Sequence, residues 1–173
     1  MITITDAHSW INEFDNVNTY IKRSTQQLLE KAETALKNKD YSEVWYLVNR
    51  VTGICDCDGD SREKAEARVK CGCIVFKMGN YKRSTELFRD ASIKYLRHLH
   101  NKGASLWMRG YVLWLLPTEH DNAIVDWRKS IEVYKRIKDD ERFSTIKQKH
   151  WYEERILEMR VSMSEAIEKD GVV

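Results

Sequence analysis

The chain has 173 residues, of which 42% are hydrophobic and 32% charged, and its net charge is +2. That length suits one domain with a sizeable core, and the composition excludes a disordered or fibrous chain. A net charge so close to zero gives no bulk attraction to nucleic acid or to anionic membranes. With a single proline, Pro117, and seven glycines, the chain favours long helices over a fold with many tight β-turns.

The N-terminal residues and the hydropathy of the chain bear on where the protein works. No apolar run approaches the roughly 20 residues that a membrane-spanning helix needs. Residues 1–6 contain no basic region and no apolar signal core. We therefore expect a cytoplasmic protein without membrane contact, whose cysteines are thiols in a reducing compartment.

Apolar residues recur at helical spacing along almost the whole chain. An N-terminal helical segment, residues 1–24, begins near Asp6, and the helix that follows ends near Asn38. Further helices are expected at Tyr41–Thr52, Ser61–Met78, Tyr81–His98, Ala104–Leu116, Asp121–Lys138 and Thr145–Lys169. Residues 53–60 and 139–144 are expected to be loops. Asp60 is expected to cap the helix after it, with Glu63 completing a capping box.

An internal repeat joins these helices into pairs. The segment Lys37–Tyr41 reads like Lys77–Tyr81, in which every residue stands 40 positions later. A further shift of about 38 residues superposes small residues on small ones and large apolar residues on large ones. The matched positions are Gly72 with Gly110, Ser84 with Ala123, Phe88 with Trp127, and Ala91 with Ser130. This pattern predicts stacked helix–turn–helix units, in which small residues let two helices approach each other.

The segment from Ala65 to Leu96 resembles a tetratricopeptide repeat (TPR). Its Gly72, its turn Gly79-Asn80-Tyr81 and its small–large–small series match that family. The resemblance covers residues 25–138. The run of repeats, together with the helix after it, is similar to TPR segments of large bacterial signalling proteins. It implies an all-α, right-handed helical-repeat solenoid of about three pairs. The N-terminal segment precedes the pairs and residues 145–169 form a capping helix, all in one domain of residues 1–173. The family's period is about 34 residues, so the connections here are longer, and the third unit has Pro117 and an extra residue at its turn.

The resemblance also implies a binding surface, because the first helix of each TPR pair lines a concave groove. The residues expected to bind a partner there are Trp107, Tyr111, Trp114, Cys73, Phe76, Lys77, Glu33 and Lys37. Aromatic side chains are strong anchors at protein interfaces. The same stripe is also compatible with core packing, with residues 1–17 filling the groove from within the chain. The lysine and asparagine positions of the chaperone-binding members of the family are not matched.

Several patterns that suggest chemistry fail on inspection. Cys55 and Cys57 are separated by one residue, as are Cys71 and Cys73, whereas zinc sites usually use a two-residue spacing. Residues two apart on a helix point about 200° apart, so Cys71 and Cys73 are better explained as small buried residues. The alternating aspartates of residues 56–60 lack the glycine and glutamate positions of a calcium loop.

The remaining polar residues do not indicate catalysis. None of the five histidines lies in a recognisable catalytic or metal motif, and no phosphate-binding glycine loop is present. Basic clusters are interleaved with acids, which does not predict a nucleic-acid site. We therefore expect no enzyme and no cofactor or metal. The leading hypothesis is a scaffold or adaptor that binds a protein, peptide or helix in its groove. The alternatives are a structural module that self-associates or packs on a partner domain, and a nucleic-acid or metal-linked binding module.

Overall fold

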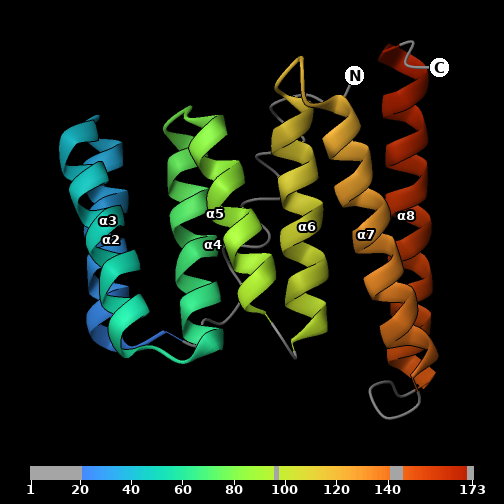
Figure 1. The fold of residues 1–173 in the computed structure, drawn as a ribbon, viewed down its shortest axis with the longest axis horizontal. Coiled ribbons are helices and arrows are strands. Elements are labelled where there is room, and N and C mark those ends of the chain that lie inside the picture. The colour runs from blue at the N-terminus through green and yellow to red at the C-terminus, as the bar shows by residue number, and fades with distance from the viewer. Residues whose placement is uncertain (1–20, 96–97, 141–145, 171–173) are drawn as a thin grey trace.

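The computed structural model describes residues 21–95, 98–140 and 146–170, and within these ranges the chain forms seven α-helices and no strand. They are α2 (Arg23–Lys37), α3 (Tyr41–Asp58), α4 (Ser61–Lys77), α5 (Tyr81–Lys94), α6 (Leu99–Trp114), α7 (His120–Asp139) and α8 (Ile146–Asp170). The helices form neighbouring pairs along a row, with α2 behind α3 and α4 behind α5 in the view of Figure 1, and each helix packs on the next one in the sequence. The prediction of an all-α fold is therefore confirmed. None of these helices combines the length and the hydropathy that crossing a bilayer requires.

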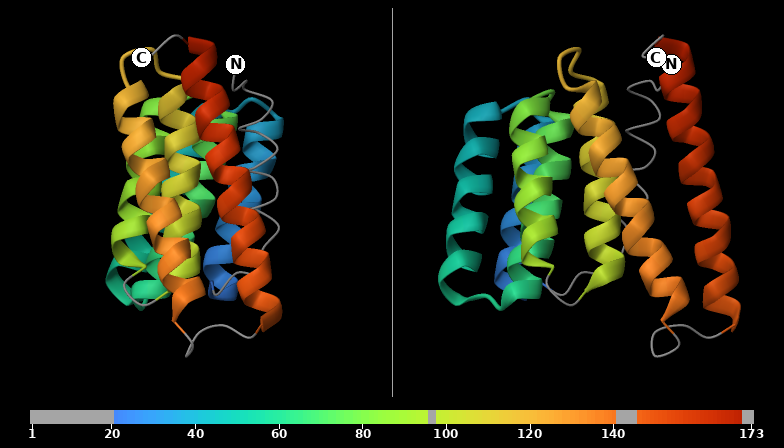
Figure 2. Two further views of the ribbon diagram at one scale, coloured as in Figure 1. Left: turned by 90° about the vertical axis from the view of Figure 1, so that its right-hand side faces the viewer. Right: turned by 45° about the vertical axis from the view of Figure 1, so that its right-hand side comes forward.

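Three antiparallel pairs follow one another along the row, α2 with α3, α4 with α5, and α6 with α7. The connections inside all three pairs lie along one side of the row, the upper side in Figure 1. Helix α8 packs on α7 and closes the row at the far edge (Figure 2). This arrangement places the turns of the three pairs next to one another.

The turns of the first two pairs have the same hydrogen bonds. In the first, Lys39 N donates to Leu36 O at 3.0 Å and Asp40 N donates to Ala35 O at 2.9 Å. In the second, Gly79 N and Asn80 N donate to the equivalent carbonyls, at 2.8 and 3.1 Å. This is the Schellman pattern, which places one residue in the left-handed region, here Lys39 (φ 58°) and Gly79 (φ 87°). The predicted repeat therefore reappears in the turns.

Each turn also starts the next helix in the same way. The side chain of Asp40 accepts a hydrogen bond from Glu43 N, and that of Asn80 accepts one from Arg83 N, both at 3.1 Å. These N-caps satisfy a backbone donor that the first turn of a helix leaves without a partner. The third pair differs, because Leu115–Glu119 form a run of i-to-i−3 bonds around Pro117. The difference expected at Pro117 is therefore present.

Close helix packing inside the second and third pairs depends on glycine. A Cβ atom at Gly72 would lie 3.1 Å from the ring of Phe88. A Cβ atom at Gly110 would overlap the indole of Trp127. Ser84 adds a hydrogen bond across the second pair, with its hydroxyl donating to Gly72 O at 2.9 Å. Small residues therefore let the two helices of each pair approach each other, as predicted, and the residue that each glycine faces is a large aromatic one of the same pair.

The core divides into two clusters of buried side chains that meet at α4. One cluster contains Val44, Val48 and Val51 of α3, with residues of α2 and α4. The other runs from α4 to α8 and holds the aromatic residues of the third pair. Helix α4 contributes to both, since Cys71 lies in the first cluster and Cys73 in the second. Both thiols are fully buried, as predicted, and the angle of about 200° between them places them in different clusters.

Three helix ends differ from their predicted positions by four residues or more. Helix α3 continues to Asp58, although residues 53–60 were expected to be a loop. Buried Cys55 extends the apolar stripe past Gly53, and this packing outweighs the low helix propensity of glycine. Helix α5 ends at Lys94 instead of His98, and α6 begins at Leu99 instead of Ala104. Gly103 is therefore inside α6, where a Cβ atom would lie 2.6 Å from the ring of Tyr134.

The connection between the first and second pairs is fixed by buried charges. Asp60 accepts a hydrogen bond from Glu63 N at 2.8 Å, which confirms the predicted cap. The carboxylate of Glu63 accepts from Lys22 N at 3.1 Å and so does not close the predicted capping box. Arg68, whose side chain is 8% exposed, donates to both carboxylate oxygens of Asp56 at 2.7 Å. Both bonds come from Nη2, while Nη1 donates to Lys64 O at 3.1 Å. Hydrogen bonds between charged groups are stronger than neutral ones, so this pair holds the end of α3 against α4.

Candidate partner-binding surface

The aromatic residues predicted to line the groove surround one tryptophan of the second helix in their pair. The rings of Trp107, Tyr111 and Trp114 lie 5.2–5.5 Å from that of Trp127. Trp127 Nε1 donates to Trp107 O at 3.2 Å. All four side chains are buried, and Trp114, the most accessible, is 4% exposed. They therefore form a packed core in the described structure, and the prediction that they bind a partner stays a prediction.

The other predicted groove residues are not gathered into one site. Cys73 and Phe76 are buried in the same cluster as the third-pair aromatics. Lys77 is half-buried in the last turn of α4, and Glu33 and Lys37 lie on α2 outside both core clusters. The expectation that residues 1–17 fill the groove lies outside the described residues. The structure thus separates the three charged positions from the five buried ones.

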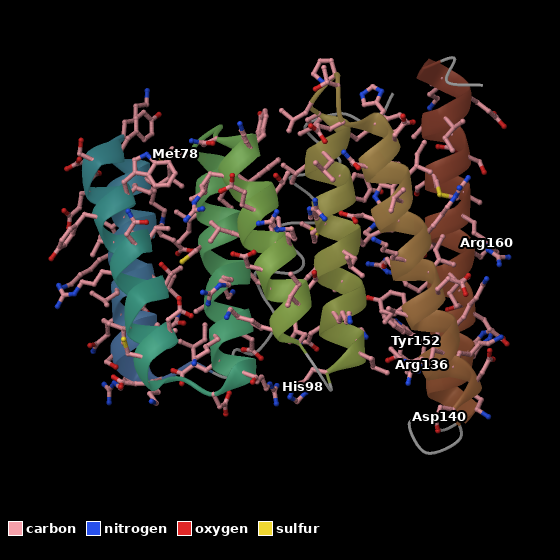
Figure 3. The ribbon with its side chains drawn as sticks, in the orientation of Figure 1. Met78, His98, Arg136, Asp140, Tyr152 and Arg160 are labelled. Atoms are coloured by element: carbon pink, nitrogen blue, oxygen red, sulfur yellow. The ribbon has the colours of Figure 1, made fainter. Side chains whose placement is uncertain are left out.

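An open cavity of about 500 Å³ lies outside this packed core, on the side of the row that carries the turns of the three pairs. It is lined by Tyr41, Trp45, Met78, Gly79, Asn80, Tyr81, Lys82 and Leu116. Met78 marks the position of the cavity, between α3 and α4 on the upper side of the row (Figure 3). Its volume falls within the range of about 300–1,000 Å³ that is typical of ligand pockets. Three segments far apart in the sequence build this cavity, the start of α3, the α4–α5 turn and the α6–α7 connection.

The walls of the cavity are aromatic and partly accessible. Tyr41, the first residue of α3, is 47% exposed, and Trp45 and Tyr81 are half-buried. The ring of Tyr81 lies 5.3 Å from that of Phe76, which anchors it to the core. Aromatic side chains held at such a position give a large contact area at low conformational cost. The cavity therefore offers a prebuilt surface for an apolar group.

Sequence analysis did not identify this cavity, although a signal for it exists. Val44, Val48, Val51 and Cys55 form the centre of the buried face of α3. At about 100° per residue, Tyr41 and Trp45 lie about 60° and 100° away from Val44 around the helix. Two large aromatic residues at the margin of an apolar stripe, beside a turn, indicate a surface and not a core position. The contributions of Met78 and Leu116 had no comparable signal.

Inside the third pair, a buried ion pair joins the two helices. Arg109 Nη1 lies 3.0 Å from Asp126 Oδ2, and Asp126 is 3% exposed. Burial raises the pKa of the Asp126 carboxyl, while Arg109 and Lys129 act in the opposite direction. This pair lies away from the cavity lining and fixes how α6 and α7 pack.

A second polar cluster connects the last helix to the third pair. His100 of α6 stacks on Tyr134 of α7, with ring centroids 5.6 Å apart. Its ring also lies against Trp151 and Tyr152 of α8, and Tyr152 Oη lies 3.3 Å from His100 Nδ1. Ile156 and Met159 of α8 are buried against the same pair. The prediction that this helix packs on the third pair is confirmed.

Within the described helices and turns, no group of three or more His, Cys, Asp or Glu side chains gathers closely enough to hold a metal ion. The four cysteines are free thiols, of which only Cys57 is exposed. The cavity lining contains none of these four residue types.

Comparison of the chain with protein-family models, with curated proteins and with solved structures finds no match.

Proposed function

We propose that this protein is a right-handed, TPR-like helical-repeat array that binds another protein. The repeated turns, with their shared Schellman bonds and side-chain caps, support the repeat architecture. So does the placement of glycine against a large aromatic residue in two successive pairs. Arrays in which each unit contacts only its neighbours commonly serve as extended binding surfaces.

The observation that carries the binding function is the aromatic cavity at the turns. Its walls combine two accessible or half-buried aromatic side chains of α3 with Met78 and Leu116. No carboxylate, imidazole or thiol lines it, so it lacks the groups that general acid–base or nucleophilic catalysis most often uses. We infer that the cavity receives an apolar side chain of a partner protein.

The experiment that tests this function compares two tyrosines of the same helix. Tyr41 lines the cavity, whereas Tyr46, which is 56% exposed, does not and points about 140° away around α3. Affinity capture from cell extract is carried out with wild type, Tyr41→Ala and Tyr46→Ala, and the captured proteins are quantified by mass spectrometry. Proteins held by wild type and Tyr46→Ala but lost by Tyr41→Ala support the proposal.

Equal capture by all three chains would place the binding surface elsewhere and reject the cavity. These variants are better suited to the question than Trp107→Ala or Tyr111→Ala. Both of those residues are at most 2% exposed, and truncation of a buried aromatic residue costs about 3–5 kcal/mol of stability. Loss of binding in such variants would not distinguish a binding residue from a folding residue.

A second function, self-association, is favoured by one observation on the last helix. Leu157 and Val161 are one turn apart on α8 and are 63% and 48% exposed. The end unit of such an array usually presents a polar outer face. If this face joins two copies, wild type will sediment as a dimer and Leu157→Ser/Val161→Ser as a monomer. A monomeric wild type would reject this second function without affecting the first.

A further inference from the structure

The cavity carries one charge that has no counterpart in the described structure. Lys82 is the only ionisable residue in the lining that is charged at neutral pH, and it is exposed. Among the ion pairs of the described residues none involves its ammonium group. The neighbouring Arg83 is paired with Glu86, at 2.6 Å. An uncompensated cation beside an apolar cavity favours an anionic group in a ligand.

The polar atoms of the aromatic lining point to the same chemistry. Tyr41 and Tyr81 carry hydroxyl groups and Trp45 carries an indole N–H, all of which can donate a hydrogen bond. Over the described part of the chain, none of these three groups has a hydrogen-bond partner. Tyr81 is also the first residue of α5, whose N-cap Asn80 is uncharged, and the amino-terminal end of a helix has a partial positive charge. Donors and positive potential therefore coincide at the cavity.

Acidic groups near the turns lie outside the cavity lining. Asp40, which precedes Tyr41, caps α3 by accepting from Glu43 N and offsets the positive end of that helix. Neither Asp40 nor Glu43 lines the cavity, and neither does Glu119, which follows the α6–α7 connection. Aromatic walls alone would also suit a cation, but Lys82 would repel one. An anionic ligand is therefore preferred to a cationic one.

We propose that the cavity binds an acidic linear segment of the partner protein, in which a large apolar side chain stands next to a carboxylate. This inference rests on the proposed function and names the chemistry of its partner. The apolar side chain packs against Tyr41, Trp45 and Met78, and the carboxylate pairs with Lys82. An extended segment suits the cavity because its walls come from three successive turns.

A charge reversal at Lys82 tests this chemistry without endangering the fold. Lys82 is exposed in the first turn of α5, where an acidic residue interacts favourably with the helix dipole. The probe is a library of short random peptides displayed on phage and selected on immobilised full-length protein. Wild type, Lys82→Glu and the matched control Lys31→Glu are compared, since Lys31 is an exposed residue of α2 outside the cavity lining. Enriched peptides are then synthesised, and their Kd values are measured by fluorescence anisotropy.

Wild type and Lys31→Glu are expected to enrich peptides in which Trp, Phe or Leu adjoins Asp or Glu. Lys82→Glu should weaken those peptides roughly tenfold, because an attractive charge contact becomes a repulsive one, and should enrich Lys or Arg in their place. Absence of acidic enrichment, or a peptide preference that Lys82→Glu leaves unchanged, overturns the proposal. If native partners are lost by Tyr41→Ala but retained by Lys82→Glu, the binding function stands and the acidic chemistry is wrong. If capture depends on neither residue, both proposals fail.

Discussion

Gly110 of α6 and Trp127 of α7 are so close that a methyl group at position 110 would overlap the Cδ1 and Nε1 atoms of the indole. The indole has little freedom to move away. Trp107, Tyr111 and Trp114 surround it, and its N–H donates to Trp107 O. The absence of a side chain at Gly110 is therefore a requirement of the third pair.

Gly110→Ala is expected to destabilise the protein by about 1–3 kcal/mol, the usual cost of overpacking a core. The better helix propensity of alanine, worth about 1 kcal/mol, offsets part of this. Gly53→Ala is the matched control, because position 53 lies inside α3 with no atom within 4 Å of a new Cβ. That variant should gain about 0.5–1 kcal/mol. Urea denaturation of the three chains measures both changes, and a Gly110→Ala protein as stable as wild type would contradict the packing.

Lys39→Gly is expected to stabilise the turn between α2 and α3. Lys39 has a φ of 58°, and the equivalent residue of the next turn, Gly79, has a φ of 87°. A left-handed conformation costs a residue with a side chain about 1–2 kcal/mol, and the greater freedom of glycine in the unfolded chain reduces the net gain to about 1 kcal/mol or less. The reciprocal variant, Gly79→Ala, should lose stability by a similar amount. A fall in the thermal midpoint of Lys39→Gly would refute this account of the turn.

Among the four cysteines, Cys57 should react quickly with a thiol reagent in the native protein. Cys55, Cys71 and Cys73 are at most 1% exposed. Burial raises the pKa of the Cys71 thiol from 9.0 to about 12, so it remains protonated and unreactive at neutral pH. Native labelling with an aromatic disulfide reagent should show one fast thiol, and unfolding in urea should release the others. In Cys57→Ser the fast phase should disappear, and its persistence would locate an accessible thiol at another cysteine.

Asp126 is expected to make the free energy of unfolding depend on pH in the acidic range. Burial raises the pKa of its carboxyl from an ordinary value of 3.8, so the folded state binds a proton more tightly than the unfolded state. The contribution of Asp126 to stability is therefore present at low pH and is lost as pH rises through the folded pKa. Measured by urea denaturation over a pH series, wild type should lose stability relative to Asp126→Asn as pH increases. Asp121→Asn, an exposed change on α7, controls for the loss of one negative charge, and a constant difference between wild type and Asp126→Asn would reject the prediction.

The repeat pairs could be predicted because their signals are local. The turn residues Asn80 and Gly79, the glycines facing large aromatic residues and the apolar spacing all lie within a few turns of one another. Helix ends were less predictable where packing opposes propensity. Gly53 suggests a break, but Cys55, two residues later, is buried and extends the helix. The same competition accounts for the early start of α6 before Gly103.

The candidate site was harder to predict, because it depends on which neighbour covers each face. Spacing places Trp107, Tyr111 and Trp114 on one side of α6, but it does not show that Trp127 packs against them. The cavity combines Tyr41, Lys82 and Leu116, which lie in three different pairs. Only the relative placement of the pairs brings such residues together, and one sequence taken alone contains no direct signal for that placement.

The division of the core at α4 leads us to expect two cooperative units. Helices α2 and α3 contribute no residue to the larger cluster, so we expect the first pair to open more readily than the remaining helices. Amide hydrogen exchange in α2 and α3 should then report a smaller opening free energy than exchange in α6. The cavity spans this boundary, since Tyr41 and Trp45 lie on one side of it and Lys82 and Leu116 on the other. A ligand in the cavity would therefore hold the two units together, and its binding would be measurable as slower amide exchange in the first pair.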